Sequence, residues 1–236
     1  MKIGLIHPGE MGAAIGKALV AAGQVVLWAS EGRSEPTRAR AGSFVDVGTV
    51  EALAAQAGVI VSVVPPHAAL DVARALSGYD GIYVDANAVA PATAREVGGC
   101  FARFVDGGII GGPPDPHLYV SGSEAATVAA LFSGSPVEAR VVSNASALKC
   151  AYAGWSKGSA ALLLEMRAYA QATGVWDDLA AEWPAATHER LEAAERSAAK
   201  KGWRWVGEME EIATALGEEG LPRGFHEAAA EMYRSD

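Results

Sequence analysis

Residues 2–12 read KIGLIHPGEMG, and this stretch decides the fold class. An apolar run at 2–6 leads into a turn with two glycines, Gly9 and Gly12, and an amphipathic segment begins near Glu10. This strand–turn–helix order is the context of the G-x-G-x-x-G fingerprint, in which a helix N-terminus faces a pyrophosphate. Gly9 and Gly12 match its second and third glycines, whereas His7 stands at the first, so a plain strand-to-helix turn remains the alternative. The predicted dinucleotide-binding residues of the turn are His7, Pro8, Gly9, Glu10, Met11 and Gly12.

Apolar runs alternate with alanine-rich segments over roughly the first 140 residues. The run at 59–64, VIVSVV, is almost continuously apolar, as expected of a strand buried on both faces of a helix-covered parallel sheet. The alternation predicts an open α/β sheet of the Rossmann type. The predicted strands are 2–6, 24–28, 59–64, 81–85, 103–105, 118–121 and 138–142, and the predicted helices are 10–22, 49–57, 68–76, 92–97 and 124–131.

The pattern changes near residue 143. Residues 144–173 contain no proline and no strand-like alternation, and they predict one long helix that is apolar on most sides. Such a helix is buried in a domain core or against another subunit. Further helices are predicted at 176–182, 185–201, 206–216 and 225–234, with Gly202 as a break. We therefore predict an NAD(P)-binding Rossmann domain at 1–143 and a small all-α domain at 144–236 for substrate binding and dimerisation.

Composition excludes several classes of protein. The 236 residues carry a formal net charge of −9, and an acidic chain without a Lys/Arg block is a poor sequence-independent nucleic-acid binder. Two cysteines, Cys100 and Cys150, are too few for a disulfide framework, and neither belongs to a metal-ligating cluster, so no metal site is predicted. The N-terminal apolar run is too short for a signal peptide, and no uncharged stretch is long enough for a membrane span. We expect a cytoplasmic protein with no membrane or nucleic-acid partner.

The loop after the strand at 24–28 bears on which dinucleotide binds. In NAD sites an acidic residue follows the second strand and bonds the ribose hydroxyls, whereas a basic residue accommodates the 2′-phosphate of NADP. No acid directly follows this strand; Ser30, Arg33 and Ser34 can donate hydrogen bonds to a phosphate, and Glu31 argues the other way. The loop favours NADP with NAD possible, and an ordinary exposed polar loop is the alternative.

Five segments in a fixed order carry a family resemblance: GEMG at 9–12, VVPPH at 63–67, VDANAVAP at 84–91, DGGIIGG at 106–112 and SALK at 146–149. Through these segments the chain resembles the β-hydroxyacid dehydrogenase family, which includes 3-hydroxyisobutyrate and 6-phosphogluconate dehydrogenases. The likeness covers nearly the whole chain, and the C-terminal part looks like a less characterised branch with a shortened helical domain.

The resemblance implies roles for individual residues. Lys149 matches the family's catalytic lysine and would act as general acid/base on the substrate oxygen. Further cofactor contacts implied by the matched segments are Val64, Pro65, Pro66 and Asn87. Substrate contacts implied in the same way are Asn87, Gly111 and Gly112.

The chain also departs from the family's pattern. Ile110 stands where the family has a serine, Asn87-Ala88 where it has Ser-Thr, and Ala153 where it has an asparagine. Tyr152, Lys157 or His117 could replace these contacts, and Tyr152 and Lys157 are the predicted substrate residues.

These observations predict an NADP-preferring, homodimeric oxidoreductase that interconverts a small hydroxy acid, or a related alcohol, and its oxo form. Loss of polar contacts favours a less polar substrate and leaves an imine or carbonyl reductase as one alternative. The histidine at position 7 leaves a second, a non-catalytic NADP(H)-binding sensor or assembly protein.

Overall fold

The computed structural model describes residues 1–113 and 116–234. Its chain divides into two units, Met1–Lys149 and Cys150–Asp236. The first unit carries the sheet and the second is helical, so the predicted fold class, a Rossmann-like α/β region followed by helices, is confirmed. Within the described part of the chain, no helix combines the length and apolar character that a membrane span requires.

One sheet forms the middle of the first unit, and its described strands follow the order β3-β2-β1-β4-β5-β6-β7-β8. Strands β1 to β6 are parallel, β7 is antiparallel to β6, and β8 is parallel to β7. The strand order reverses at β1, and a crevice at the carboxyl ends of β1 and β4 is where such sheets bind ligands. The strands are β1 (Lys2–Ile6), β2 (Val25–Trp28), β3 (Val45–Asp46), β4 (Val59–Ser62), β5 (Ile82–Asp85), β6 (Phe104–Ile110), β7 (His117–Ser121) and β8 (Ala139–Val141).

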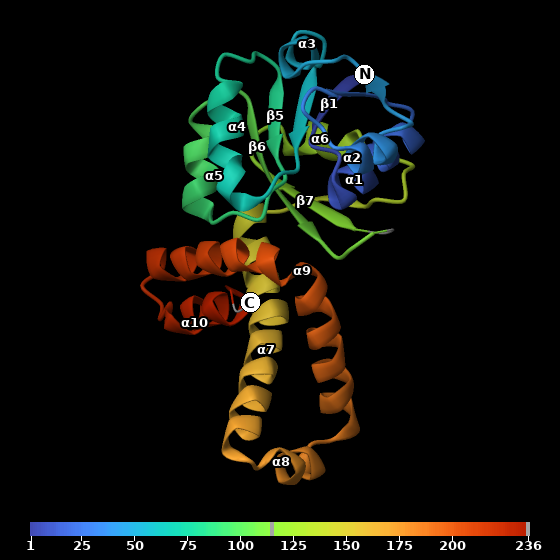
Figure 1. The fold of residues 1–236 in the computed structure, drawn as a ribbon. Coiled ribbons are helices and arrows are strands. Elements are labelled where there is room, and N and C mark those ends of the chain that lie inside the picture. The colour runs from blue at the N-terminus through green and yellow to red at the C-terminus, as the bar shows by residue number, and fades with distance from the viewer. Residues whose placement is uncertain (114–115, 235–236) are drawn as a thin grey trace. The chain divides into compact units, whose positions relative to one another are not determined.

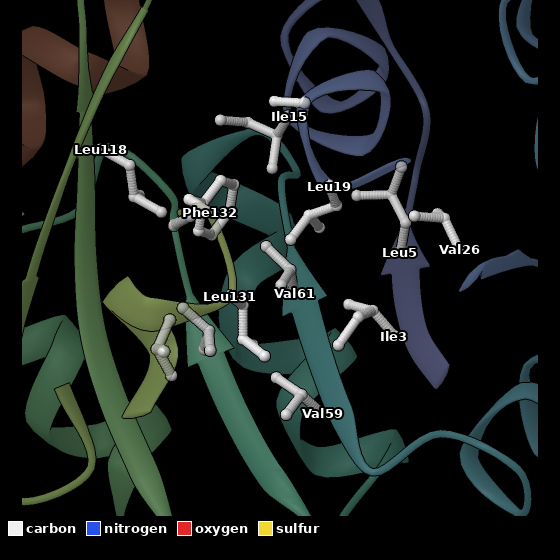
Figure 2. Packing of buried hydrophobic residues seen from close by; sticks show 14 of the residues in the cluster. Ile3, Leu5, Ile15, Leu19, Val26, Val59, Val61, Leu118, Leu131 and Phe132 are labelled. Atoms are coloured by element: carbon white, nitrogen blue, oxygen red, sulfur yellow. The ribbon is translucent and has the colours of Figure 1, made fainter. Parts of the chain in front are cut away.

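Helices cover both faces of this sheet, with α1 and α2 on one side of the strands and α4 and α5 on the other (Figure 1). Strand β4 shows the alternation. Val59 and Val61 face the cluster that contains Ile15 of α1 (Figure 2). Ile60 belongs to the cluster on the opposite face. Burial on both faces explains the unbroken apolar run of this strand. The helices of the first unit are α1 (Glu10–Ala21), α2 (Glu35–Arg40), α3 (Val50–Ala54), the 3-10 turn η1 (Pro66–Ala68), α4 (Ala69–Ala75), α5 (Pro91–Gly98) and α6 (Ala125–Ala130).

The second unit is formed by most of α7 (Ala145–Thr173), with α8 (Trp176–Glu182), α9 (Ala185–Glu218) and α10 (Gly224–Arg234). Helix α8 joins the C-terminal end of α7 to the N-terminal end of α9 (Figure 1). The core of this unit contains Met209 and Ile212 of α9 and Tyr233 of α10. Gly154 and Gly158 of α7 make room for α10, because a Cβ on either glycine would lie 3.1–3.2 Å from side-chain atoms of α10.

The structure corrects the predicted elements in three places. The break at Gly202 is wrong: α9 continues through this glycine, which is buried near Tyr233. The strand predicted at 103–105 extends to Ile110, since its two central glycines still pair with β7. Strand β3 and helix α2 were not predicted, because both are short and present almost no buried side chain.

Candidate functional site

The glycine turn joins β1 to α1 at the point where the strand order reverses. Gly12 has no room for a side chain, because a Cβ there would lie 2.4 Å from the His7 carbonyl oxygen. Gly9, by contrast, has only ordinary contacts at 3.4–3.5 Å. It precedes α1 without a side-chain cap, so the helix begins with amide groups that no capping side chain covers. The turn has the form expected of a phosphate-binding helix N-terminus.

His7 adopts a left-handed backbone with φ of +64°. Glycine enters this region freely and other residues rarely do, which explains why the fingerprint has a glycine at the position. The Gly9 amide donates to the His7 carbonyl oxygen at 2.7 Å and closes the turn. The departure at position 7 therefore changes the side chain while the backbone keeps a glycine-like conformation.

Three arginines gather around the loop that follows β2. Arg33 Nη1 donates to His7 Nδ1 at 3.1 Å, and Arg38 Nη2 donates to the Ser30 carbonyl oxygen at 2.7 Å. Arg40 Nε donates to the Pro8 carbonyl oxygen at 3.3 Å. Arg33 and Arg40 thus tie the loop and α2 to the glycine turn. The Nε atom of Arg33 is buried and has no hydrogen-bond partner among the described residues.

Ser30, Arg33 and Ser34 are the predicted cofactor residues of this loop, and Arg38 and Arg40 were not predicted. Ser34 is exposed, and its Oγ lies 3.2 Å from Thr37 Oγ1. The signal that could have singled out the two arginines is their recurrence within one short segment directly after the second strand.

A cluster of three buried polar side chains joins the carboxyl ends of β4 and β5. Asn87 Oδ1 accepts from the Val64 amide at 2.6 Å, and Asn87 Nδ2 donates to Asp85 and, at 3.4 Å, to Ser62 Oγ. All three polar side chains are buried. Asn87 therefore fixes the segment of Val64, Pro65 and η1 against β5, and its predicted contacts to cofactor and substrate stay predictions.

Lys149 lies in the second turn of α7, and the start of this helix is anchored to β6 and β7. Asp106 Oδ2 accepts from the Ser146 amide at 2.9 Å and from Ser121 Oγ at 3.0 Å. Ser121 Oγ in turn accepts from the Ala145 amide at 3.0 Å. These contacts satisfy amides at the helix start and place a carboxylate at the positive end of the helix dipole.

Gly108 of β6 lets this helix approach closely. A Cβ there would lie 2.8 Å from the Ala145 carbonyl oxygen and 3.0 Å from the Lys149 Cβ. The lysine, which is half-buried, is therefore held against β6 by packing and by the bonds to Asp106. Asp106 and Ser121 were not predicted as positioning residues, since only the antiparallel register of β6 and β7 brings them opposite each other.

The other predicted substrate residues are Gly111, Gly112, Tyr152 and Lys157. Gly111 has φ of +87°, and Gly112 has open space where a Cβ would lie. Within the second unit, Lys157 pairs with Glu208 and lies 5.6 Å from the centre of the Trp205 ring. Tyr152 is exposed. The structure thus gives Lys157 a partner of its own, and a substrate role for these residues stays a prediction.

A hollow of about 760 Å³ lies on the α3–α4 side of the sheet. Its lining includes Ile6, Arg33, Tyr79 and Gly81, and Arg33 is the one predicted cofactor residue among the lining residues. The strand-end geometry is therefore better evidence for a cofactor site than this hollow.

Comparison with family models gives two matches. Residues 2–89 match the model described as NADP oxidoreductase, coenzyme F420-dependent. Residues 167–235 match a domain of unknown function, DUF1932. An uncharacterised 28.5 kDa protein in the 7S RNA 5′ region of Methanothermus fervidus is 32% identical over 188 residues, which are 76% of this chain and 74% of the relative.

Solved structures share the fold over nearly the whole chain. A conserved protein of unknown function, described as structurally similar to 3-hydroxyacid dehydrogenases, is 26% identical with a TM-score of 0.71, over 98% of this chain and 96% of that one. The 3-hydroxyisobutyrate dehydrogenase of Salmonella typhimurium is 16% identical with a TM-score of 0.72, over 99% and 93% of the two chains. A variant imine reductase of Myxococcus stipitatus, in complex with NAD⁺, is 20% identical with a TM-score of 0.57, over 99% and 92%. The last two show a common fold.

Proposed function

The chain belongs to a β-hydroxyacid dehydrogenase-like family of dehydrogenases and reductases, and we propose that it is an NADP-preferring oxidoreductase acting on a small hydroxy acid, or a related alcohol, and its oxo form. The observation that carries the proposal is the arginine group Arg33, Arg38 and Arg40 beside the glycine turn. We assign cofactor binding to residues 1–143 and substrate binding and dimerisation to residues 144–236. Cys100 and Cys150 form no disulfide among the described residues, and on this ground we place the protein in the cytoplasm.

The residues present fit NADP. The uncapped start of α1 suits the pyrophosphate, and a 2′-phosphate suits the guanidinium of Arg33, whose buried Nε lacks an acceptor among the described residues. No acidic side chain directly follows β2 to take up the ribose hydroxyls as in NAD sites. NAD could bind the same turn in place of NADP, because both nucleotides present the same pyrophosphate.

Lys149 is the proposed general acid/base. The bound nicotinamide supplies the hydride-transfer chemistry. On oxidation of the substrate, the neutral Nζ of Lys149 takes the hydroxyl proton; on reduction, its ammonium form returns a proton to the carbonyl oxygen. Asp106 and Ser121 hold the helix turn that carries this lysine, so they position it without touching the substrate. The open backbone at Gly111 and Gly112 would receive the substrate carboxylate.

An imine or carbonyl reductase on the same scaffold is the second candidate. It is favoured by the apolar residues Ile110, Ala88 and Ala153, which stand where the resemblance expects polar substrate contacts. Assays with NADPH and a panel of small oxo acids, ketones and cyclic imines distinguish the two. Turnover of oxo acids supports the dehydrogenase, and turnover of imines or neutral ketones alone supports the reductase.

NADPH is expected to stabilise the protein more than NADH does. At a concentration of NADPH about 100-fold above its Kd, linkage raises the free energy of unfolding by ~2.7 kcal/mol. For a chain of this size that corresponds to an increase in Tm of roughly 5–10 °C. The measurement is thermal unfolding with each nucleotide at matched concentrations, with free phosphate as the control. If neither nucleotide changes the Tm, the cofactor proposal is wrong.

We also propose a homodimer formed through α7. Large apolar side chains on this helix are exposed. Successive members lie three, seven, four and three residues apart, and this spacing places them in one stripe along the helix. Trp155 is 72% exposed and Tyr169 65%, and such an exposed stripe marks a contact surface for another helix. The stripe consists of Tyr152, Trp155, Leu162, Met166 and Tyr169.

Trp155→Glu is expected to convert the dimer into a monomer, because it places a charge within the stripe that the proposed dimer buries. Light scattering after gel filtration should give twice 24.3 kDa for the unmodified chain and 24.3 kDa for the variant. Trp203→Glu is the matched control, since Trp203 is an exposed tryptophan on α9 outside the stripe. A monomeric unmodified chain would refute the dimer.

A further inference from the structure

The side chain at the first fingerprint position makes a specific contact that a glycine could not make. His7 Nδ1 accepts a hydrogen bond from Arg33 Nη1 at 3.1 Å. A guanidinium carries donors only, so Nδ1 must hold its lone pair, and the proton of the neutral ring lies on Nε2. This bond links the end of β1 to the loop that follows β2.

The contact with His7 uses one edge of the Arg33 guanidinium and leaves a donor on the other edge unsatisfied among the described residues. Nη1 is used by His7, whereas Nε and Nη2 form the other edge of the planar guanidinium, the edge that binds phosphate through two parallel N–H groups. Nε is buried, and no described residue accepts a hydrogen bond from it. An arginine fixed at one edge, with a donor unsatisfied at the other, is prepared for an anion.

The loop that carries Arg33 is held as well. Arg38 donates from Nε to the Arg33 carbonyl oxygen at 3.2 Å and from Nη2 to the Ser30 carbonyl oxygen at 2.7 Å. The backbone of Arg33 is therefore held by Arg38 and its side chain by His7. Holding a flexible side chain before binding reduces the ordering cost that a ligand must meet.

We infer that His7 is a positioning residue that holds Arg33 for the 2′-phosphate and so sets the preference of this site for NADP over NAD. At position 7 the backbone keeps the left-handed conformation of a glycine, and the imidazole adds a contact that glycine lacks. The inference rests on the proposed function and adds a residue that determines cofactor specificity.

The test uses two variants of the full chain at one position. His7→Gly removes the acceptor and is unstrained at φ of +64°. His7→Asn keeps an acceptor on a short side chain and tolerates the left-handed region. The probes are adenosine 2′,5′-bisphosphate and adenosine 5′-monophosphate, which differ by the 2′-phosphate alone. Calorimetric titration gives the ratio of their Kd values, and unfolding temperatures establish that each variant is folded.

The unmodified chain is expected to bind the bisphosphate at least about tenfold more tightly, as a charge-assisted contact implies. His7→Gly should reduce that ratio about fivefold or more through weaker bisphosphate binding, and His7→Asn should keep it within about threefold. An unchanged ratio in His7→Gly, an equal loss in both variants, or equal binding of the probes to the unmodified chain overturns the inference and leaves the oxidoreductase standing. Failure of both probes and of NADPH to bind overturns the proposed function with it.

Discussion

Lys149→Ala is expected to lower kcat by about 10²–10⁴, the usual contribution of a positioned general acid or base. Such a loss corresponds to roughly 3–5 kcal/mol in the activation free energy. Affinity for NADPH should be unchanged, because the predicted cofactor contacts come from the turns after β1, β2 and β4. The measurement is kcat and KM on the best substrate of the panel, together with NADPH titration.

Two further variants make the result specific to proton transfer. Lys149→Arg keeps a positive charge but cannot lose its proton, so it should be nearly as impaired as the alanine variant. Lys17→Ala removes an exposed lysine of α1 and should leave kcat unchanged. Retention of most of the activity by Lys149→Arg would show that the lysine acts through its charge, and full activity of Lys149→Ala would exclude it from the chemistry.

The elements that could be predicted from sequence are those whose own side chains form the core. Val59 to Ser62 and the first strand are completely or almost completely buried, and their apolar runs reveal this directly. Helix α2 has one buried residue, Thr37, and its Arg40 donates to the Pro8 carbonyl oxygen, which is distant in sequence. Periodicity cannot reveal such a helix, because its stability comes from tertiary hydrogen bonds.

Gly202 was expected to end a helix because glycine favours C-terminal caps. In α9 it costs about 1 kcal/mol of helix propensity relative to alanine, and packing between α9 and α10 outweighs that cost.

Tertiary contacts also limited what could be predicted of the candidate site. The lysine segment was recognisable from its residues, but Asp106 precedes Ser146 by 40 positions, and only the fold shows that its carboxylate caps the helix of Lys149.

Gly12→Ala is expected to destabilise the first unit and to abolish cofactor binding. A Cβ at this position would lie 2.4 Å from the His7 carbonyl oxygen, and that atom belongs to the backbone, so it cannot move without displacing the turn. Overpacking of this kind typically costs about 1–3 kcal/mol, which for this chain lowers Tm by roughly 2–12 °C. Thermal unfolding without nucleotide measures the effect, and NADPH titration below the transition measures the loss of binding.

Gly9→Ala separates the structural role of the turn from its binding role. The new methyl group would have its nearest neighbours at 3.4 and 3.5 Å, and the backbone φ of −66° suits alanine, so the Tm without nucleotide should stay within about 2 °C of the original. NADPH affinity should nevertheless fall about tenfold or more, since the methyl group would occupy the space through which the phosphates approach the amides of α1. Unchanged affinity in Gly9→Ala would mean that no ligand approaches the turn there. In that case Gly12 would serve only the packing of α1 on β1, and the proposed phosphate site would be a strand-to-helix turn without a ligand.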